Sequence, residues 1–391
     1  MTDIPSGYKQ TEVGVIPLDW EEHTIGELIE FEGGSQPDKS VFIASWKIGY
    51  VRLIQIRDYK TDKYETYVPT HLARRFCTER DIMIGRYGPP VFQILRGIAG
   101  AYNVALIKAK PRPSINDSYS YYYLKQDKLF AFIEKLSQRS SGQTGVDLKE
   151  LRQYPLPLPP TKAEQEAIAE ALSDTDALIE SLKQLIAKKR QIKHGAMQEL
   201  LTGKKRLPGF SGEWEMKSFG DVFNIAAGGD VEPQRTISYQ DKIHCYPIYS
   251  NALTDFGLYS YCSYADHQAG SITVTARGTL GFANFRDHAY TAIGRVLVLQ
   301  SKQETDGRFF AEVINNRIKF AIESTGVPQL TAPQISAYRV PVPPLPEQTA
   351  IAEVLSDMDA DIAALETKLA KTRALKQGMM HNLLTGRIRL V

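Results

Sequence analysis

A long internal repeat constrains this chain more than any other feature of its sequence. The segment from Glu164 to Leu207 aligns without a gap with the segment from Glu347 to Leu390, and about 25 of the 44 aligned positions are identical. The two copies lie 183 residues apart, far beyond the spacing of about 20–50 residues that is typical of solenoid repeats. The 391 residues are therefore expected to form one domain-plus-helix unit that occurs twice.

Each copy of the repeat is predicted to form one long helix. A proline-rich connector, Pro155 to Pro160 or Pro341 to Pro346, ends the element before it. Gly203 and Gly386 follow the last Leu-Leu pair of each copy, as stop signals do. The roughly 40 residues between these limits give a helix of about 60 Å at about 1.5 Å per residue.

An apolar stripe with heptad spacing runs along each predicted helix. A helix of this length with one apolar seam has to bury that seam against another helix, and the matching register makes the other copy the expected partner. Two unrelated helices on separate cores are the alternative. Gly195 and Gly378, at equivalent positions inside the helices, indicate close approach, a kink or simple inheritance. The predicted seam consists of Ile168, Leu172, Ile179, Leu182, Ile186, Ile351, Leu355, Met358, Ile362, Leu365 and Leu369.

The regions before the two helices share landmarks and differ between them. The strand-like run from Asp81 to Gly88 resembles the run from Ser271 to Gly278, whereas residues 35–80 do not align with residues 230–270. One scaffold with two different contents suits a protein that reads two different things. Weaker matches join Trp20 to Gly26 with Trp214 to Gly220, Gly33-Gly34 with Gly228-Gly229, and Thr144 to Val146 with Thr325 to Val327.

Composition narrows the class of protein. Lys and Arg number 47 against 45 Asp and Glu, so binding to nucleic acid would have to come from local clusters of charge or from a basic partner. No apolar run approaches the roughly 18 residues of a membrane span, and the N-terminal residues lack a signal-peptide core. The three cysteines form no Cys-x-x-Cys pair, which favours a reducing cytoplasm.

The repeat pattern resembles a known family. Two divergent globular regions, each followed by a proline-rich connector, Glu-Gln, Ile-Ala, Leu-Ser-Asp and Leu-Leu-Thr-Gly, resemble the specificity (S) subunits of Type I restriction-modification systems. The resemblance covers essentially the whole chain. In that family the globular regions are target recognition domains of mixed α/β structure. The helices pack antiparallel, act as a ruler between the domains and dock the methyltransferase subunits.

This resemblance implies an α+β fold with two target recognition domains, an antiparallel coiled coil and a pseudo-two-fold internal repeat. The expected domains are recognition domain 1 at residues 1–155, spacer helix 1 at 156–206, recognition domain 2 at 207–340 and spacer helix 2 at 341–391. Each recognition domain would read one half of a bipartite DNA target. The target would be asymmetric because the two halves differ in sequence, and antiparallel helices of this length match one to two turns of B-DNA.

The same resemblance implies the partners. They are double-stranded DNA, two methyltransferase (modification) subunits and the restriction (translocating endonuclease) subunits, and no membrane. The chain itself would hold no cofactor, since S-adenosylmethionine belongs to the methyltransferase, and no metal.

Candidate DNA-binding residues are polar, cationic or aromatic side chains near predicted strand ends, where loops carry function. Arg86 and Arg277 both lie beside a glycine at such an end; a solvated arginine is the plain alternative for either. The tyrosine-rich run at residues 118–123 is expected to be core, with a stacking surface as the alternative. The basic clusters near Lys188 and Lys371 are expected to be a solvated helix face, with contact to phosphate or a partner as the alternative. The full set is Arg57, Tyr59, Lys60, Arg86, Tyr87, Arg139, Gln143, Thr144, Asn251, Thr254, Arg277, Thr279 and Asn284.

Motifs of an enzyme are missing from the sequence. Tyr87-Gly-Pro-Pro90 lacks the amide and the aromatic residue of a methyltransferase catalytic loop, and no glycine-rich nucleotide loop is present. His244, Cys245, Cys262 and His267 do not have the spacing of a closed zinc site. A non-catalytic DNA-binding adaptor is the leading interpretation. The alternatives are a methyltransferase or nuclease with cryptic motifs, a scaffold that binds only proteins, and an inactive paralogue.

Overall fold

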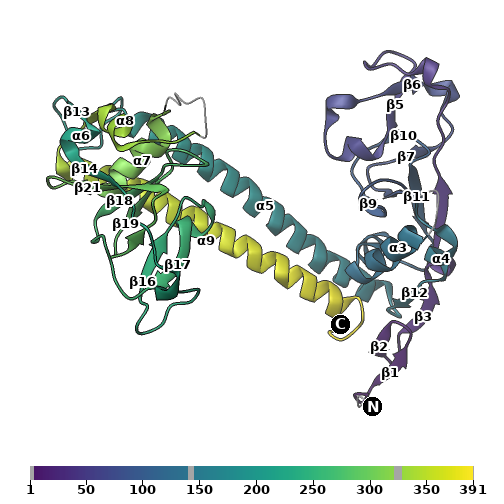
Figure 1. Cartoon of the computed structure of the whole chain (residues 1–391). Coiled ribbons are helices and arrows are strands. Elements are labelled where there is room, and N and C mark those ends of the chain that lie inside the picture. The colour runs from purple at the N-terminus through teal and green to yellow at the C-terminus, as the bar shows by residue number, and fades with distance from the viewer. Residues whose placement is uncertain (1–3, 140–144, 321–327, 391) are drawn as a thin grey trace. The chain divides into compact units, whose positions relative to one another are not determined.

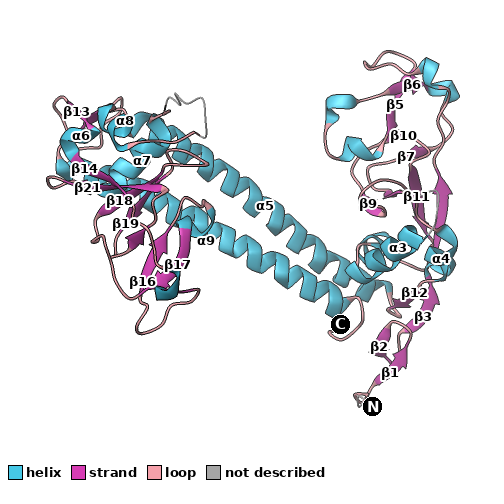
Figure 2. Cartoon of the chain, in the orientation of Figure 1, coloured by secondary structure: helices cyan, strands magenta, loops and turns pink. Residues whose placement is uncertain are grey.

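The chain folds into two compact units, each built from a globular part and stretches of both long helices. The computed structural model describes residues 4–139, 145–320 and 328–390. The first unit comprises residues up to Leu182 together with those from Lys368, and the second unit comprises Lys183–Thr367. Helices and strands are mixed in both units, so the α+β fold class is confirmed (Figures 1 and 2).

The first unit holds two four-stranded sheets and two short strand pairs. The sheets have the orders β4-β11-β8-β9 and β6-β5-β10-β7, and the pairs are β1-β2 and β12-β3. The strands are β1 (Tyr8–Thr11), β2 (Gly14–Pro17), β3 (Glu21–Thr24), β4 (Ile29–Gly33), β5 (Tyr50–Ile54), β6 (Tyr67–Pro69), β7 (Phe76–Cys77), β8 (Ile82–Gly85), β9 (Gln93–Leu95), β10 (Gly100–Tyr102), β11 (Leu106–Pro111) and β12 (Pro155–Leu158).

Short helices complete the core of the first unit. The tyrosine-rich run lies in α2, where Tyr119, Tyr122 and Tyr123 are buried, so its prediction as core is confirmed. The helices of this part are α1 (Ile25–Leu28), η1 (Lys39–Val41), η2 (Ile56–Tyr59), η3 (Asp62–Tyr64), η4 (Thr70–Leu72), α2 (Asp117–Leu124), α3 (Asp127–Arg139) and α4 (Leu148–Gln153).

The second unit repeats this plan. Its sheets have the orders β14-β21-β18-β19 and β15-β17-β16-β20, with the pair β13-β22. The strands are β13 (Glu215–Ser218), β14 (Phe223–Ala227), β15 (Thr236–Ile237), β16 (Tyr246–Tyr249), β17 (Leu258–Cys262), β18 (Ser271–Thr275), β19 (Ala283–Arg286), β20 (Thr291–Ala292), β21 (Val296–Ser301) and β22 (Arg339–Val342). The helices are α6 (Phe219–Val222), η5 (Pro233–Arg235), η6 (Thr254–Gly257), α7 (Gly307–Arg317) and α8 (Ala332–Ala337).

In each unit one four-stranded sheet has the same topology, and we call it the frame sheet. The other four-stranded sheet differs between the units. β4-β11-β8-β9 and β14-β21-β18-β19 have the same order and pairing directions. The frame also keeps one glycine in each unit, because a Cβ at Gly34 would lie 1.9 Å from the Asn103 carbonyl oxygen and one at Gly228 would lie 2.5 Å from that of Ala292. The second sheets share a parallel pair, β5 with β10 and β16 with β20, but differ at their edges.

The two long helices are α5 (Lys162–Leu200) and α9 (Leu345–Leu383), each drawn as one element in Figure 1. In the first unit the start of α5 faces the end of α9, where Lys376 Nζ lies 2.6 Å from Asp176. In the second unit the end of α5 faces the start of α9, where Lys193 Nζ lies 2.5 Å from Asp359. The helices therefore run antiparallel. These two ion pairs are the same pair of repeat positions, because 193 + 183 = 376 and 176 + 183 = 359.

A second pair of repeat-equivalent ion pairs closes each unit. Arg206 binds the carboxylate of Glu347 in the second unit, and Arg389 binds Glu164 in the first. Both glutamate side chains are completely buried. We call these the two joints, because each fastens the segment after one long helix to the start of the other.

Most of the predicted seam is buried, and its ends belong to the globular cores. Ile168 and Leu172 lie in the core of the first unit with Leu383 and Leu384 of the other helix end. Ile351 and Leu355 lie in the second core. Ile179, Leu182, Ile186 and Ile362 are buried, whereas Met358, Leu365 and Leu369 are half-buried. The role of this set in joining the helices stays a prediction, as do the four domain limits.

The structure narrows two expectations about the helices. At Gly195 and Gly378 no atom lies within 4 Å of the position that a Cβ would take, so close helix approach does not explain these glycines. Lys188 and Arg190 are exposed, as expected of a solvated face, while Lys189 pairs with Asp361 and the largely covered Lys193 pairs with Asp359. The cross-helix register brings these acids to the lysines, and a single stretch of sequence does not reveal that register.

Candidate nucleic-acid interface

Most of the predicted DNA-binding residues lie on two kinds of segment. One is the segment that leaves the end of β5 or β16, and the other is the loop between β8 and β9 or between β18 and β19. The ends of β5 and β16 are equivalent positions, because the Ile54 carbonyl accepts a hydrogen bond from Asn103 N–H and the Tyr249 carbonyl accepts one from Ile293 N–H. We call residues 55–66 and 250–257 the strand-end segments.

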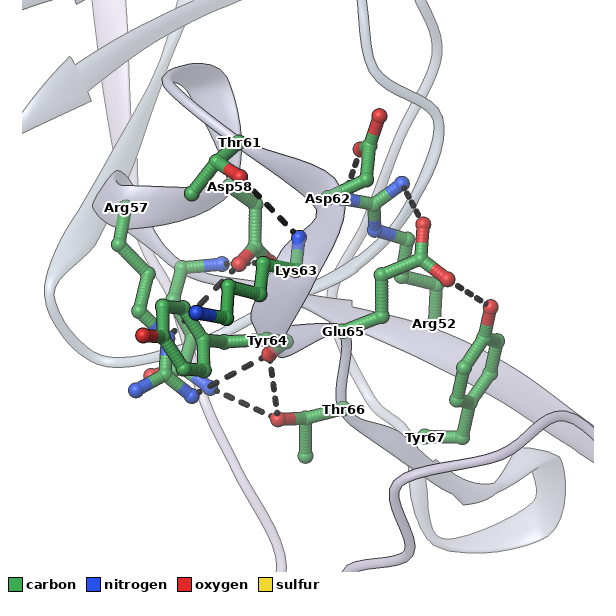
Figure 3. Close-up of polar contacts among 11 residues, drawn as sticks. Arg52, Arg57, Asp58, Thr61, Asp62, Lys63, Tyr64, Glu65, Thr66 and Tyr67 are labelled. Carbon is green, nitrogen blue, oxygen red and sulfur yellow. Dashed lines mark hydrogen bonds and ion pairs between the residues drawn. The ribbon is translucent and has the colours of Figure 1, made fainter.

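The first strand-end segment is a short polar arch built on an ion-paired base (Figure 3). Arg52 binds Asp62 at 3.0 Å and Glu65 at 2.8 Å, which ties the arch back to β5. The guanidinium of Arg57 lies 5.6 Å from the ring centre of Tyr64, and the ammonium of Lys63 lies 5.5 Å from it. An exposed aromatic ring with two cations beside it is therefore presented at the end of this arch.

Asp58 holds the turn of this arch from inside. Its side chain is completely buried, and Oδ2 accepts a hydrogen bond from Gln55 N–H at 3.0 Å. Burial raises the pKa of this carboxyl, with the Gln55 hydrogen bond and the nearby arginines opposing the rise.

Tyr59 and Lys60 line a polar pocket with Asp58, Arg52 and Arg96. The Tyr59 hydroxyl is buried and has no hydrogen-bond partner among the described residues. Burial also raises the pKa of this hydroxyl strongly. Of the predicted trio, Arg57 and Lys60 are exposed to solvent, and Tyr59 is half-buried.

The second strand-end segment is shorter and is held by an arginine. Arg286, only 4% exposed, donates from Nη2 to the Phe256 carbonyl at 2.7 Å and from Nε to Thr273 Oγ1 at 2.9 Å. Its guanidinium lies 3.4 Å from the ring centre of Tyr249, and burial lowers its pKa. Sequence reasoning did not single out Arg286 or Phe256, since neither follows a recognisable turn or motif.

The hairpin loops carry the next group of candidates. Arg86 lies 5.1 Å from the ring centre of Tyr87, and the Arg277 guanidinium donates to Gln329 Oε1 at 2.9 Å. The backbone pairs Tyr87 with Gly145 and Arg277 with Gln329. The structure therefore makes Tyr87, rather than Arg86, the equivalent of Arg277.

The remaining candidates in the second unit cluster beside that loop. Asn251 donates from Nδ2 to the Arg277 carbonyl at 2.9 Å, which joins the second strand-end segment to the hairpin loop. Thr254 and Thr279 are exposed, and Asn284 is half-buried on β19.

In the first unit Arg139 is the last residue of α3, and Gln143 and Thr144 lie outside the described residues. DNA contact by all thirteen residues stays a prediction.

The described residues also bear on metal sites, disulfides and membrane-spanning helices. Among the residues that the structure describes, no three His, Cys, Asp or Glu side chains lie close enough to hold a metal ion. Cys77 and Cys262 are buried thiols and Cys245 is exposed, all three unpaired. No helix in the described ranges has the length and apolar character needed to cross a membrane.

Comparison with known proteins identifies relatives of this chain. Residues 17–189 and 211–372 each match the family described as the Type I restriction modification DNA specificity domain. A Methanocaldococcus jannaschii protein, provisionally named as the specificity subunit of the type I restriction enzyme MjaX, is 28% identical over 98% of this chain and 97% of its own. The MjaVIII specificity subunit of the same organism is 23% identical over 96% of this chain and 94% of its own.

Solved structures show the same fold. The S subunit of a Type I restriction-modification system from M. genitalium superposes with a TM-score of 0.64 at 17% identity, over 93% of this chain and 96% of that one. A chain from a study of complex assembly and conformational transition in a type I restriction-modification system superposes with a TM-score of 0.56 at 15% identity, over 95% and 99% of the two chains.

Proposed function

The chain belongs to the family of Type I restriction modification DNA specificity domains, and we propose that it is the DNA-reading subunit of such a complex. Each globular part reads one half of a bipartite, asymmetric DNA target. The observation that carries this proposal is the contrast between the two units. The frame sheet and the joint are repeated, while the strand-end segments differ in length, charge and anchoring.

The long helices set the spacing between the two half-sites. Support comes from the cross-helix ion pairs at repeat-equivalent positions, which fix one antiparallel register in each unit. A helix of 39 residues is about 58 Å long at about 1.5 Å per residue, comparable with one to two turns of B-DNA at about 34 Å each.

The helices also dock two methyltransferase subunits. Ile192 is 50% exposed on α5, and its repeat equivalent Leu375 is 61% exposed on α9. An apolar side chain that is exposed at the same position of both repeats is suited to two equivalent partner contacts. Restriction subunits join through this assembly. The chemistry lies in these partners, S-adenosylmethionine is bound by the methyltransferase, and the assembled complex acts in the cytoplasm.

The test is a genome-wide map of adenine methylation in cells that express the cognate methyltransferase with or without this chain. A gapped, two-part motif that appears only with the chain is the expected result. An assembled complex that produces no chain-dependent motif would contradict the proposal and favour a scaffold without DNA specificity.

A matched deletion in the same assay tests the spacing. Removing residues 183–189 and their repeat equivalents 366–372 keeps the heptad phase of both helices and shortens each by about 10 Å. The gap between the half-sites should then shrink by about 3 base pairs, at about 3.4 Å per base pair, with both half-sites unchanged. An altered half-site with an unaltered gap would contradict the role in spacing.

A further inference from the structure

The second strand-end segment contains a strained turn. Asp255 has φ 49° and ψ 43°, and Phe256 has φ 51° and ψ 24°, so two adjacent residues other than glycine adopt the left-handed conformation. Each such residue costs about 1–2 kcal/mol, and the conformation persists only where the surroundings enforce it. Strained turns of this kind cluster at functional sites, so the residues of this one are expected to have a function.

The side chain at this turn points away from the core. Phe256 is 69% exposed, whereas the nearby aromatic residues Tyr249 and Tyr290 are buried. The carbonyl of Phe256 is held by the buried guanidinium of Arg286, and Ser250 N–H donates to the Gly257 carbonyl at 2.7 Å. The fold therefore fixes the backbone of Phe256 firmly and leaves its ring in solvent.

The first unit presents an aromatic ring from the equivalent segment. Tyr64 is also exposed and lies at the end of the first strand-end segment (Figure 3), with Arg57 and Lys63 beside its ring. The two segments differ in length and in their anchors. Both carry Thr-Asp shortly before an exposed aromatic residue, Tyr64 in the first unit and Phe256 in the second.

We propose that Phe256 inserts between two base pairs of the second half-site when the complex binds DNA. The proposal rests on the proposed function, because it takes DNA as the ligand. Apolar side chains such as Phe and Leu act as wedges of this kind and partly unstack a base step.

The neighbouring polar groups favour DNA over a protein partner. Asn251 and Thr254 lie in the same segment as Phe256, and Asn251 donates to the carbonyl of Arg277. The segment that carries the ring therefore also carries side chains of the kinds that contact base edges and phosphates.

The test uses the assembled complex of this chain and its methyltransferase, with the two-part target as duplex DNA. Phe256→Ala should weaken binding about 10- to 100-fold, because stacking on an aromatic side chain contributes about 1–3 kcal/mol per base. Phe256→Leu keeps an apolar wedge and should retain most of the affinity. Tyr239→Ala removes another aromatic side chain of the second unit, 67% exposed, and should bind within about twofold of the unaltered complex.

A second readout locates the wedge. 2-Aminopurine is placed in turn at each adenine of the second half-site, where unstacking raises its fluorescence. One position should brighten with the unaltered complex and with Phe256→Leu, and stay quenched with Phe256→Ala. Methyltransferases extrude their target base from the duplex, so the target adenine should give a separate signal that persists in all variants.

The outcomes separate the two proposals. Unchanged binding and unchanged fluorescence with Phe256→Ala would overturn the wedge and leave the reading of DNA intact. A uniform loss of binding with Phe256→Ala and Tyr239→Ala alike would also overturn it. If the unaltered complex binds no two-part target, the proposed function itself fails.

Discussion

Both units hold a strand-end segment in place, but they do so with side chains of opposite charge. In the first unit the strand-end segment is organised by acids, with Asp58 buried beneath the turn and Glu65 paired with Arg52. In the second unit a buried arginine, Arg286, holds the segment by its backbone carbonyl. The frame sheets beneath are the same. The difference shows that the frame fixes where a segment leaves the sheet and leaves its chemistry free to vary.

The joints provide a finer comparison. Glu347 binds Arg206 and also accepts a hydrogen bond from Trp214 Nε1 at 3.1 Å. Glu164 binds Arg389, which is shared with Asp19 at 2.9 Å, while the indole N–H of the nearby Trp20 has no hydrogen-bond partner among the described residues. Arg206 also donates to the carbonyls of Ser211 and Gly212, so the arginine has further acceptors in both joints, whereas the carboxylate accepts an indole N–H only in the second.

The largest expected effect is a loss of stability when the arginine of a joint is removed, and it should differ between the two units. Arg389→Ala should destabilise the first unit by about 3–5 kcal/mol, because it leaves the buried Glu164 carboxylate without its cation. Arg206→Ala should destabilise the second unit by about 1–2 kcal/mol less, because Glu347 keeps the Trp214 hydrogen bond. Amide hydrogen exchange, resolved by peptide, measures the two units separately.

The matched controls neutralise the carboxylate. Glu164→Gln combined with Arg389→Ala, and Glu347→Gln combined with Arg206→Ala, remove the uncompensated charge and should recover part of the lost stability. Equal losses in the two single variants would mean that Trp214 contributes nothing to the second joint.

A smaller effect on stability is expected for Asp58, the buried acid of the first strand-end segment, and this effect depends on pH. Burial raises the pKa of Asp58 above its unfolded value, so the ionised carboxylate is penalised in the folded first unit at neutral pH. The penalty is full above the folded pKa and vanishes below the unfolded one. Asp58→Asn should therefore stabilise the first unit on the order of 1 kcal/mol at pH 7, with a gain that shrinks as the pH falls.

Asp62→Asn is the control for Asp58, since that side chain is exposed in the same arch. It should change stability little, because its ion pair with Arg52 is exposed to solvent. Urea unfolding at a series of pH values measures both variants. A gain for Asp58→Asn that grows on acidification would show that the carboxylate stabilises the arch.

The smallest effect is expected to be equal in the two repeats. Gly195→Ala and Gly378→Ala each place a methyl group in open space inside a long helix. Each should stabilise its unit by about 1 kcal/mol, because alanine loses less backbone entropy than glycine. Thermal unfolding should shift upward by a few degrees for either variant. A gain in stability at one position alone would mean that the two glycines do not have equivalent surroundings.

The sequence predicted the long repeated helices and failed where a contact joins residues far apart in the chain. Both long helices follow from proline, glycine and heptad signals, and α5 ends at Leu200, just before the Gly203 stop. The acids that meet Lys189 and Lys193 lie more than 160 residues away, so no local pattern reveals them. Phe256 was missed because its left-handed backbone is imposed by Arg286, 30 residues later.

The joint at Arg389 gives the chain an unusual order of assembly. Leu383 and Leu384 belong to the core that contains Trp20 and Ile25, so the first unit combines residues that precede the second unit in the chain with residues that follow it. Domains usually fold in the order in which they emerge from the ribosome. Here the second unit is finished first, and the first globular part waits for the final turn of α9. A frameshift within the last turns of α9 would thus damage the unit whose globular part was translated before the second unit.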